Sequence, residues 1–545
     1  MPVVTLYFNR LQKILERKVS IEKIVSALPL LGLDIEEETK DHVNVEYSPN
    51  RPDFSTDYGI ANGLQGLLGI KLGMIKLKIK KGKDAIKADS SITKVRPYIT
   101  AIEARNGILD DETIRQFIAM QEDLHNGIGR RRKKVSIGIH DLDKIQFPLM
   151  YNAVSRTHRF VPIGSEDEMT ISEVLQKTET GTMYMNLLEG SEMVPAIIDS
   201  VGNTISFPPI INSKLTEVTT KSQNLLVEVT ATDKNAAEDT LAVVAYILQS
   251  AGFQLYSVRI SGANNSTPSL DARNMLLDPT LVTETLGLDV SPSVIIKSIR
   301  KSRLDGKIKG QRIICTIPRY RADIFGPIDL VEEVALGHCV QNLDPTIPES
   351  SSAGQKNRIT VLLDAARSTM IGLGYSEVMN FGLVGKHTQY DLTSRDASRM
   401  ISVADSKSQE HHILRDALLP GLIDVLSKNI HEPYPQKIFE IGTIFDKDNP
   451  IKEAIHLGCV SAHGDVSYSE IKSILHSFLK TGFNLPCKTT ADVNPVFVEG
   501  RTANVLVNEE EIGLIGEVAP AIIDNFRLRI PVAGFEIKLS GLIFD

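Results

Sequence analysis

Hydrophobic and polar positions along the first part of the chain predict a short strand followed by a helix. A β-rich run covers residues 3–8, and apolar residues then recur with helical spacing between the N-cap residue Ser20 and the helix breaker Pro29. Farther on, apolar residues alternate with lysine, which predicts a half-exposed strand. We interpret the Lys/Gly-rich tract 80–87 as a boundary, so that an N-terminal structural domain covers residues 1–88.

Residues 89–263 combine helical and strand patterns in the manner of an α/β domain. Asp110 is the predicted N-cap of a long helix. A β-α-β signature closes the region, with β-rich runs at 225–230 and 255–260 on either side of a helical pattern at 235–251. We therefore expect an α/β domain here.

The remaining chain predicts two further domains. Two helical patterns, a hairpin with its turn at Gly310 and a third helix beginning at Pro327 give a winged-helix-like order over 268–345. A Ser/Gly/Gln-rich linker at 349–355 leads into residues 350–545, whose pattern is typical of a mixed, mainly antiparallel sheet with helices. The predicted fold class is thus a multidomain α+β protein.

Length and composition agree with this division. The chain has 545 residues, which fits three or four domains, and its 42% apolar and 23% charged residues are ordinary for a soluble globular protein. The net charge of −8 argues against a general nucleic-acid coat protein but leaves room for a local basic patch. Arg130–Lys134 is such a patch: its pattern permits a nuclear-localisation signal or a phosphate-contacting surface, although a solvated loop is the more common explanation.

Cysteine spacing and hydropathy favour the cytoplasm. The four cysteines lie far apart, so they predict neither a disulfide framework nor a zinc site and fit a reducing compartment. No apolar run approaches the roughly 18 residues of a membrane span, and the N-terminal apolar run precedes its basic residues, the wrong order for a secretory signal. We expect a cytoplasmic protein with no membrane partner.

Four carboxylates gather around the start of the helix that begins at Pro327. Asp329, Glu332 and Glu333 have the spacing i, i+3, i+4 and so share one helical face, and Asp323 precedes them across a Gly-Pro turn. Four hard oxygen donors without histidine or cysteine suit Mg²⁺ or Ca²⁺. The alternative is that acids in a first turn complement the helix dipole.

A second polar set lies in the α/β domain. The run 206–212 (SFPPIIN) precedes a strand that carries Glu228 and Thr230 two positions apart, so both side chains point to the same face. At the carboxyl end of a strand such a pair lines a ligand crevice, but half-exposed strands also carry polar pairs without any ligand.

Six collinear motifs make the whole chain resemble the β subunit of phenylalanyl-tRNA synthetase, of the shorter archaeal type close to the eukaryotic one. They are, in chain order, residues 48–53 (SPNRPD), 129–141 (GRRRKKVSIGIHD), 206–212 (SFPPIIN), the four carboxylates, 414–421 (LRDALLPG) and 437–442 (KIFEIG).

The resemblance implies a role for each domain. The N-terminal domain contacts a partner subunit, and the winged-helix-like domain carries Mg²⁺ on Asp323, Asp329, Glu332 and Glu333 at the subunit boundary. The α/β region is the family's editing domain, which hydrolyses tRNA mischarged with tyrosine. Its implied pocket residues are Asn212, Glu228 and Thr230. The last domain resembles a class II synthetase fold that has lost catalysis. The implied partners are an α subunit, in an assembly of two α and two β chains, and phenylalanine tRNA.

The loss of catalysis can be checked in the sequence. Residues 350–545 contain no Gly-x-Gly-x-Gly-x-x-Arg, the family's third, ATP-clamping motif, because Gly372-Leu-Gly374 continues into Tyr-Ser. Without that arginine the γ-phosphate side of ATP lacks its fixed cation. Adenylation is therefore assigned to the α subunit.

Two other functions stay open on the sequence. A non-catalytic nucleic-acid-binding scaffold accounts for the basic run and the winged-helix-like order, but the acidic total charge and the carboxylate cluster would repel phosphate. A free-standing aminoacyl-ester hydrolase needs only the α/β domain. Co-purification separates them, because only a ligase subunit requires a synthetase-like chain in stoichiometric amount.

We expect that the purified chain alone does not form phenylalanyl-adenylate, because the third-motif arginine is missing. Phenylalanine-dependent exchange of pyrophosphate into ATP measures this step, with the chain plus its α subunit as the positive control. Exchange by the chain alone would contradict the assignment of adenylation to the other subunit.

Overall fold

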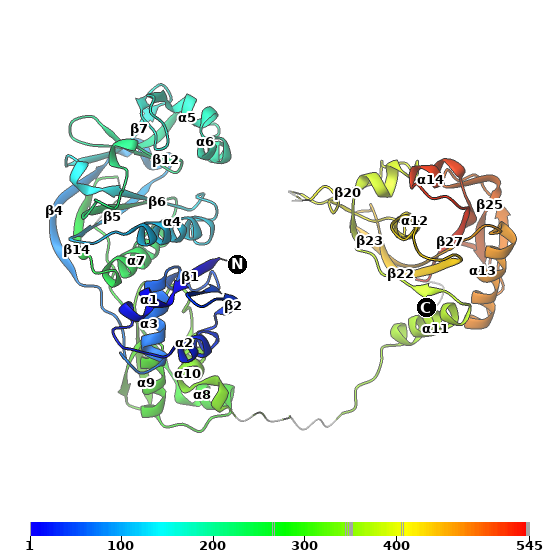
Figure 1. Ribbon diagram of the computed structural model, residues 1–545, viewed down its shortest axis with the longest axis horizontal. Coiled ribbons are helices and arrows are strands. Elements are labelled where there is room, and N and C mark those ends of the chain that lie inside the picture. Colours follow the sequence, from blue (N-terminus) through cyan, green and yellow to red (C-terminus); the bar gives the residue numbers. More distant parts are fainter. Residues whose placement is uncertain are drawn as a thin grey trace. The chain divides into compact units, whose positions relative to one another are not determined.

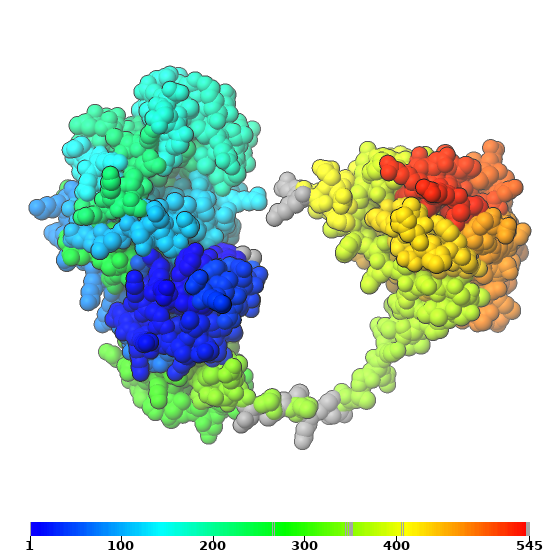
Figure 2. Space-filling model, viewed as in Figure 1, coloured from blue at the N-terminus to red at the C-terminus, as the bar shows by residue number. Residues whose placement is uncertain are grey.

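The computed structural model describes residues 2–540, except 264, 266, 344, 346, 348–351, 405 and 407. It divides into two compact units, residues 1–346 and 347–545 (Figures 1 and 2). The first unit covers the residues of the first three expected domains and the second unit those of the last, and the division of the first unit into three stays a prediction. The protein is a mixed α+β multidomain chain.

The N-terminal part of the first unit is a small sheet with helices packed against it. Its antiparallel strands follow the order β1 (Val3–Tyr7), β3 (His42–Glu46), β2 (Asp34–Glu38). Its helices are α1 (Phe8–Ile14), α2 (Ile21–Ala27) and α3 (Asp57–Leu67). The predicted helix start is confirmed, since the Ser20 hydroxyl accepts a hydrogen bond from the Lys23 N–H.

A nine-stranded sheet forms the middle of the first unit, with the strand order β12-β11-β10-β7-β4-β14-β5-β13-β6 (Figure 1). The strands are β4 (Ile79–Ala88), β5 (Tyr98–Arg105), β6 (Val135–Asp141), β7 (Leu149–Ser155), β10 (Met193–Ile198), β11 (Thr204–Phe207), β12 (Ile211–Asn212), β13 (Leu225–Ala231) and β14 (Gln254–Ser261). Helices α4 (Asp111–Asn126) and α7 (Lys234–Ser250) share an apolar core with the sheet. Between β7 and β10 the chain forms the strand pair β8 (Arg159–Phe160) and β9 (Met169–Thr170) and the helices α5 (Ile171–Lys177) and α6 (Glu179–Tyr184).

The predicted domain boundary at residue 88 is wrong, because β4 is an internal strand of this sheet. β4 pairs in parallel with β14 on one side and with β7 on the other. Backbone hydrogen bonds hold the strand in place while Lys81, Lys83 and Lys87 remain exposed to solvent. The lysine-rich composition of 80–87 therefore reflects the exposed side of the strand, whose buried residues include Ile86.

The predicted β-α-β unit is present, with one strand inserted. β13 and β14 both pair antiparallel with β5, which lies between them, and α7 connects them. All residues of β13 are buried, so its odd positions pack into the core shared with α7 and its even positions face the other side of the sheet. Asp110 and Asp233 cap α4 and α7 through their carboxylates.

The winged-helix-like segment shows the expected order of elements and one additional strand. In chain order the elements are β15 (Arg273–Leu277), α8 (Pro279–Leu286), α9 (Pro292–Lys301), β16 (Asp305–Lys309), β17 (Arg312–Ile317) and α10 (Pro327–His338). β15 pairs with β17 on the side opposite β16 and was not predicted. This segment packs closely on α3, since a Cβ at Gly66 would lie 2.0 Å from the Lys301 carbonyl oxygen and only glycine permits that approach.

The second unit is built on a seven-stranded sheet of order β18-β22-β23-β27-β26-β25-β24, in which every neighbouring pair except β18–β22 is antiparallel. The strands are β18 (Ser376–Glu377), β22 (Gln436–Asp446), β23 (Lys452–Ala462), β24 (Lys488–Ala491), β25 (Phe497–Val507), β26 (Glu510–Val518) and β27 (Val532–Lys538). Helices α11 (Arg358–Gly372) and α13 (Tyr468–Phe483) share one core with the sheet, and α12 (Leu419–Lys428) and α14 (Pro520–Asn525) share a second. A small sheet joins β19 (Leu383–Val384), β21 (Ile413–Leu414) and β20 (Ile401–Ser402).

Among the described residues, no helix combines the length and the apolar character needed to cross a membrane. All four cysteines carry free thiols, and Cys315 and Cys459 are buried in the cores of the two units.

Candidate functional site

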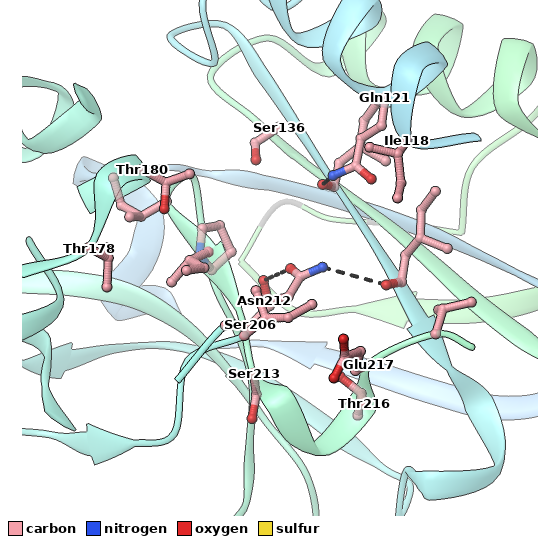
Figure 3. A pocket seen from close by; sticks show the side chains of 18 of the residues that line it. Ile118, Gln121, Ser136, Thr178, Thr180, Ser206, Asn212, Ser213, Thr216 and Glu217 are labelled. Carbon is pink, nitrogen blue, oxygen red and sulfur yellow. Dashed lines mark hydrogen bonds between the residues drawn. The ribbon is translucent and has the colours of Figure 1, made fainter. Parts of the chain in front are cut away.

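A cavity of about 700 Å³ lies beside strand β6, the last strand in the order of the nine-stranded sheet (Figure 3). Helix α4 and strand β6 contribute a mainly apolar wall that includes Phe117, Ile118, Ile137 and Ile139. The segment from β11 through the turn after β12 contributes polar groups, namely Ser206, Asn212, Ser213, Thr216 and Glu217. The cavity therefore has an apolar side and a hydrogen-bonding side.

Asn212, one of the three pocket residues that the resemblance implies, lines this cavity. β11 and β12 form a tight antiparallel pair in which Asn212 lies opposite Ser206. The Ser206 hydroxyl donates to Asn212 Oδ1 at 3.1 Å, and Asn212 Nδ2 donates to the Ile139 carbonyl at 3.5 Å (Figure 3). The asparagine thus joins the polar segment to the backbone of β6.

Arg132 closes another part of the wall and was missed as a cavity residue by the sequence analysis. It is the buried member of the basic run, whereas Arg130, Arg131 and Lys133 are exposed. Its guanidinium donates to the Ile210 carbonyl at 2.7 Å and to Glu122 Oε1 at 2.7 Å, and lies 4.6 Å from the centre of the Tyr184 ring. These contacts compensate the charge and fix the loop that follows β11.

Glu217 is a carboxylate of the polar wall that the sequence analysis also missed. It follows a single 3-10 turn, Lys214–Thr216, so no periodicity marks it. The only signal in the sequence was its position five residues after Asn212, the last residue of the motif 206–212. Gln121, Thr178 and Thr180 complete the polar lining around the space (Figure 3).

Glu228 and Thr230 lie on the buried strand β13 and do not line the cavity, contrary to the sequence prediction. β13 is flanked by β5 and β6, and of its residues Leu225 lines the cavity, whereas Glu228 and Thr230 alternate with it and point to the opposite face of the sheet. The Thr230 hydroxyl accepts a hydrogen bond from Arg96 Nε at 2.9 Å, and Arg96 also donates to the Thr230 carbonyl at 2.8 Å. Burial lowers the pKa of Arg96 to about 10.

Glu228 is connected to the cavity through two other side chains. Its Oε1 atom lies 3.9 Å from His140 Nε2, and His140 Nδ1 lies 2.9 Å from the hydroxyl of Thr216, which lines the cavity. Gly138 makes room for this contact, since a Cβ there would lie 2.4 Å from Glu228 Oε1 and 2.6 Å from His140 Nε2. If the Thr216 hydroxyl donates to Nδ1, the imidazole proton sits on Nε2 and faces the carboxylate.

The four predicted metal-binding carboxylates do not converge. Arg321, which is 2% exposed, donates to both oxygens of Asp323 at 2.8 and 2.6 Å and also to Glu333. Asp329 instead caps α10, because its Oδ2 accepts the backbone N–H groups of Phe325 at 2.6 Å and Gly326 at 2.8 Å. The side chain of Glu332 is exposed to solvent.

This arrangement does not fit a four-carboxylate magnesium site. A guanidinium already occupies the position between Asp323 and Glu333, and it would repel a second cation. Across the described residues, no group of three or more histidine, cysteine, aspartate or glutamate side chains is placed to hold a metal ion. The capping role left open by the sequence describes Asp329 in the isolated chain.

The second unit holds a cavity of about 430 Å³ whose charged groups are already paired. Arg395 binds both oxygens of Asp416 at 2.9 and 3.1 Å, and Arg399 binds Asp446 at 2.7 Å. Glu536 accepts the N–H groups of Leu418 and Leu419 and lies 3.0 Å from His456 Nδ1. These lining arginines are thus paired with carboxylates of the chain and not free to bind phosphate, which agrees with the absence of the ATP-clamping motif.

Comparison with known families identifies the modules. The model described as "tRNA synthetase B5 domain" matches residues 275–338, and the model "Phenylalanyl tRNA synthetase beta chain CLM domain" matches residues 343–539. These matches, together with a synthetase-like unit that lacks the ATP clamp, define a subunit of an aminoacyl-tRNA synthetase.

Similar proteins cover the chain from end to end. The phenylalanine–tRNA ligase β subunit of Archaeoglobus fulgidus is 37% identical over 100% of this chain and 99% of its own, and that of Methanococcoides burtonii is 33% identical over 99% and 100%. A crystal structure of an N-terminal fragment of the phenylalanyl-tRNA synthetase β subunit from Pyrococcus horikoshii matches with a TM-score of 0.59 and 30% identity, over 62% of this chain and 99% of the fragment. The chain belongs to the family of phenylalanine–tRNA ligase β subunits, which confirms the resemblance seen in the sequence.

We expect that the isolated chain does not bind Mg²⁺ at micromolar concentrations, because Arg321 occupies the space between two of the four carboxylates. Arg321→Met should destabilise the first unit by about 3–5 kcal/mol, since buried charges lose their partner, and millimolar Mg²⁺ should recover part of this loss. Calorimetric titration measures the binding, and chemical unfolding measures the stability.

Arg300→Met is the matched control for this experiment. Arg300 forms an exposed ion pair with Asp305, and such pairs contribute only about 0–1 kcal/mol. Micromolar binding of Mg²⁺ to the wild-type chain alone would restore the four-ligand prediction.

Proposed function

We propose that this chain supports the attachment of phenylalanine to its tRNA by a separate α subunit and that its first unit hydrolyses tyrosyl-tRNA in the cavity beside β6. The observation that carries the hydrolytic part is the cavity itself, which sets an apolar wall against a cluster of hydrogen-bonding groups. Its volume of about 700 Å³ falls within the range of small-molecule sites.

The two walls suit a tyrosyl group. The ring would contact the apolar side formed by α4 and β6, and the phenolic hydroxyl would donate to a carboxylate or amide oxygen on the other side, with Glu217 and Asn212 as the candidates. Phenylalanine would leave those groups unpaired, which is worth roughly 10⁴–10⁵ in discrimination, whereas an apolar synthetic site rejects an added hydroxyl by only about 10².

The contacts that connect Glu228, His140 and Thr216 support hydrolysis, because they can position the attacking water. In the hydrolytic step a water oxygen attacks the ester carbonyl, the bond to the ribose oxygen breaks, and that oxygen takes up a proton. A Thr216 hydroxyl that donates to His140 has its lone pairs free to orient the water, and Glu228 stabilises the required imidazole tautomer. Glu228 would therefore act through His140 without touching the substrate.

We expect that Glu217→Gln in the assembled enzyme lowers hydrolysis of preformed tyrosyl-tRNA by about 10–100-fold, because a neutral amide is a weaker acceptor for the phenol. Glu228→Gln should lower the same rate through kcat with KM unchanged, since it acts through the tautomer and orientation of His140 and does not touch the substrate. Phenylalanine charging should stay unchanged in both variants.

Glu168→Gln is the control, because this carboxylate pairs with Arg159 on the surface of the same domain and lies outside the cavity. Equal rates for wild type and Glu217→Gln would remove Glu217 from the site. No hydrolysis of tyrosyl-tRNA by the wild-type enzyme would refute the editing function.

The α subunit needs a docking surface, and the second unit exposes an apolar one. Val361 and Ile371 on α11 are 51% and 57% exposed, and Met379 and Phe381 in the segment after β18 are 92% and 76% exposed. Only Ala366 and Met370 of α11 are buried. Large exposed apolar side chains grouped on one segment are typical of a protein interface. We place the α subunit on this surface.

We also propose that a magnesium site at the start of α10 forms only when the α subunit changes the pairing of Arg321 with Asp323 and Glu333.

We expect that Phe381→Asp weakens association with the α subunit by about 10–100-fold, because a charge would replace an aromatic contact. Val493→Asp is the matched control: Val493 is 77% exposed but lies between β24 and β25. Sedimentation of mixed subunits measures the affinity, and formation of phenylalanyl-tRNA in the same mixtures should follow it. Equal affinities for the two variants would move the interface elsewhere.

A further inference from the structure

The turn between α4 and β6 holds three consecutive arginines in an unfavourable backbone conformation. Arg130, Arg131 and Arg132 have φ angles of 48°, 54° and 62°, in the left-handed region that ordinarily favours glycine. Non-glycine residues persist in this region where the surrounding structure fixes them, and such positions cluster at functional sites. The surrounding structure therefore holds this turn in a defined conformation.

Two sets of contacts fix the turn next to the cavity. The Arg132 N–H donates to the His125 carbonyl at 3.1 Å, and the Lys134 N–H donates to the Gly129 carbonyl at 2.8 Å. The Arg132 side chain is part of the cavity wall and holds the Ile210 carbonyl. Because Arg132 is anchored in the wall, its neighbours in the turn must lie beside the cavity.

Those neighbours present positive charge without partners. Arg130, Arg131 and Lys133 are exposed, and within the part of the chain that the structure describes no ion pair involves them. Lys81, Lys83 and Lys87 on β4 are likewise exposed and take part in no ion pair among the described residues, so the turn differs from them by its position next to Arg132, a residue of the cavity wall. In a chain with a net charge of −8, three unpaired cations adjacent in sequence to a residue of the cavity wall favour an anionic ligand.

We propose that Arg130, Arg131 and Lys133 bind phosphates of the 3′-terminal strand of the tRNA whose esterified end enters the cavity. The inference rests on the proposed hydrolytic function, because an ester at the end of an RNA strand can reach the cavity only if the preceding phosphates pass its rim. The turn would contact the backbone and not the bases, so it positions the strand and adds no sequence specificity. In Figure 2 the light-blue segment around residue 130 lies at the surface of the first unit.

The test uses the assembled enzyme and the triple variant Arg130→Gln/Arg131→Gln/Lys133→Gln. For hydrolysis of tyrosyl-tRNA we expect KM to rise at least about tenfold at physiological salt while kcat stays within about twofold. The salt dependence of log kcat/KM should flatten by about 2, the value for three single-strand phosphate contacts. Hydrolysis of tyrosine methyl ester, which has no phosphate, should not change.

The matched control is Lys81→Gln/Lys83→Gln/Lys87→Gln, which removes three exposed cations from β4 of the same sheet. Wild-type KM and salt dependence in the first triple variant, or an equal change in the control, would overturn the proposal. So would loss of α-subunit association in the first variant, because the turn would then bind the partner protein.

A second variant distinguishes loss of phosphate binding from damage to the cavity. If the glutamine variant also loses methyl-ester hydrolysis, then Arg130→Lys/Arg131→Lys/Lys133→Arg must recover the wild-type KM, and failure to recover it would overturn the proposal. If the wild-type enzyme does not hydrolyse tyrosyl-tRNA, the proposed function fails, and binding of a fluorescent RNA with the tRNA 3′-terminal sequence still tests the turn. The same flattening of about 2 in the salt dependence of that binding is then required.

Discussion

A buried network of ion pairs joins the beginning of the chain to the winged-helix-like segment, and the architecture of the first unit depends on it. Arg51 pairs with Asp53 at 2.8 Å and lies 4.0 Å from Glu333, which in turn binds Arg321 and, through it, Asp323. Replacing such a network by apolar groups can leave the free energy of unfolding unchanged, but removing one member typically lowers it by about 3–5 kcal/mol. The network therefore fixes the packing of two segments that lie almost 300 residues apart in the sequence, those of Arg51 and Glu333.

Other close contacts hold the same segments together. The rings of Tyr246 on α7 and Tyr320 after β17 stack at 4.0 Å, which ties the nine-stranded sheet to the same segment. The approach of Gly66 to Lys301 ties α3 to it. Three segments that the sequence separates into domains thus pack as one unit, and carboxylates that could have bound a metal serve this packing in the isolated chain.

The strand order of the nine-stranded sheet decides which polar residues line the cavity beside β6. All side chains of β13 are buried, and the Thr230 hydroxyl on this strand accepts its hydrogen bond from Arg96. Beside β6 the sheet order ends, and the space there is lined by Asn212 of the short strand β12 and by Glu217 of the turn that follows it. The cavity therefore combines an apolar wall from α4 and β6 with polar groups from the segment that follows β11.

Local patterns in the sequence determined the family, the helix starts at Ser20 and Asp110, the mainly antiparallel last domain and the missing ATP clamp, because each depends on residues close together along the chain. Asn212 was predicted as a pocket residue for the same reason, as part of a contiguous motif. Only the tertiary structure decided that β4 is an internal strand, that Glu217 and not Glu228 faces the cavity, and that Arg321 separates two of the four carboxylates. These outcomes depend on strand order and on contacts between distant segments, which hydrophobic periodicity does not encode.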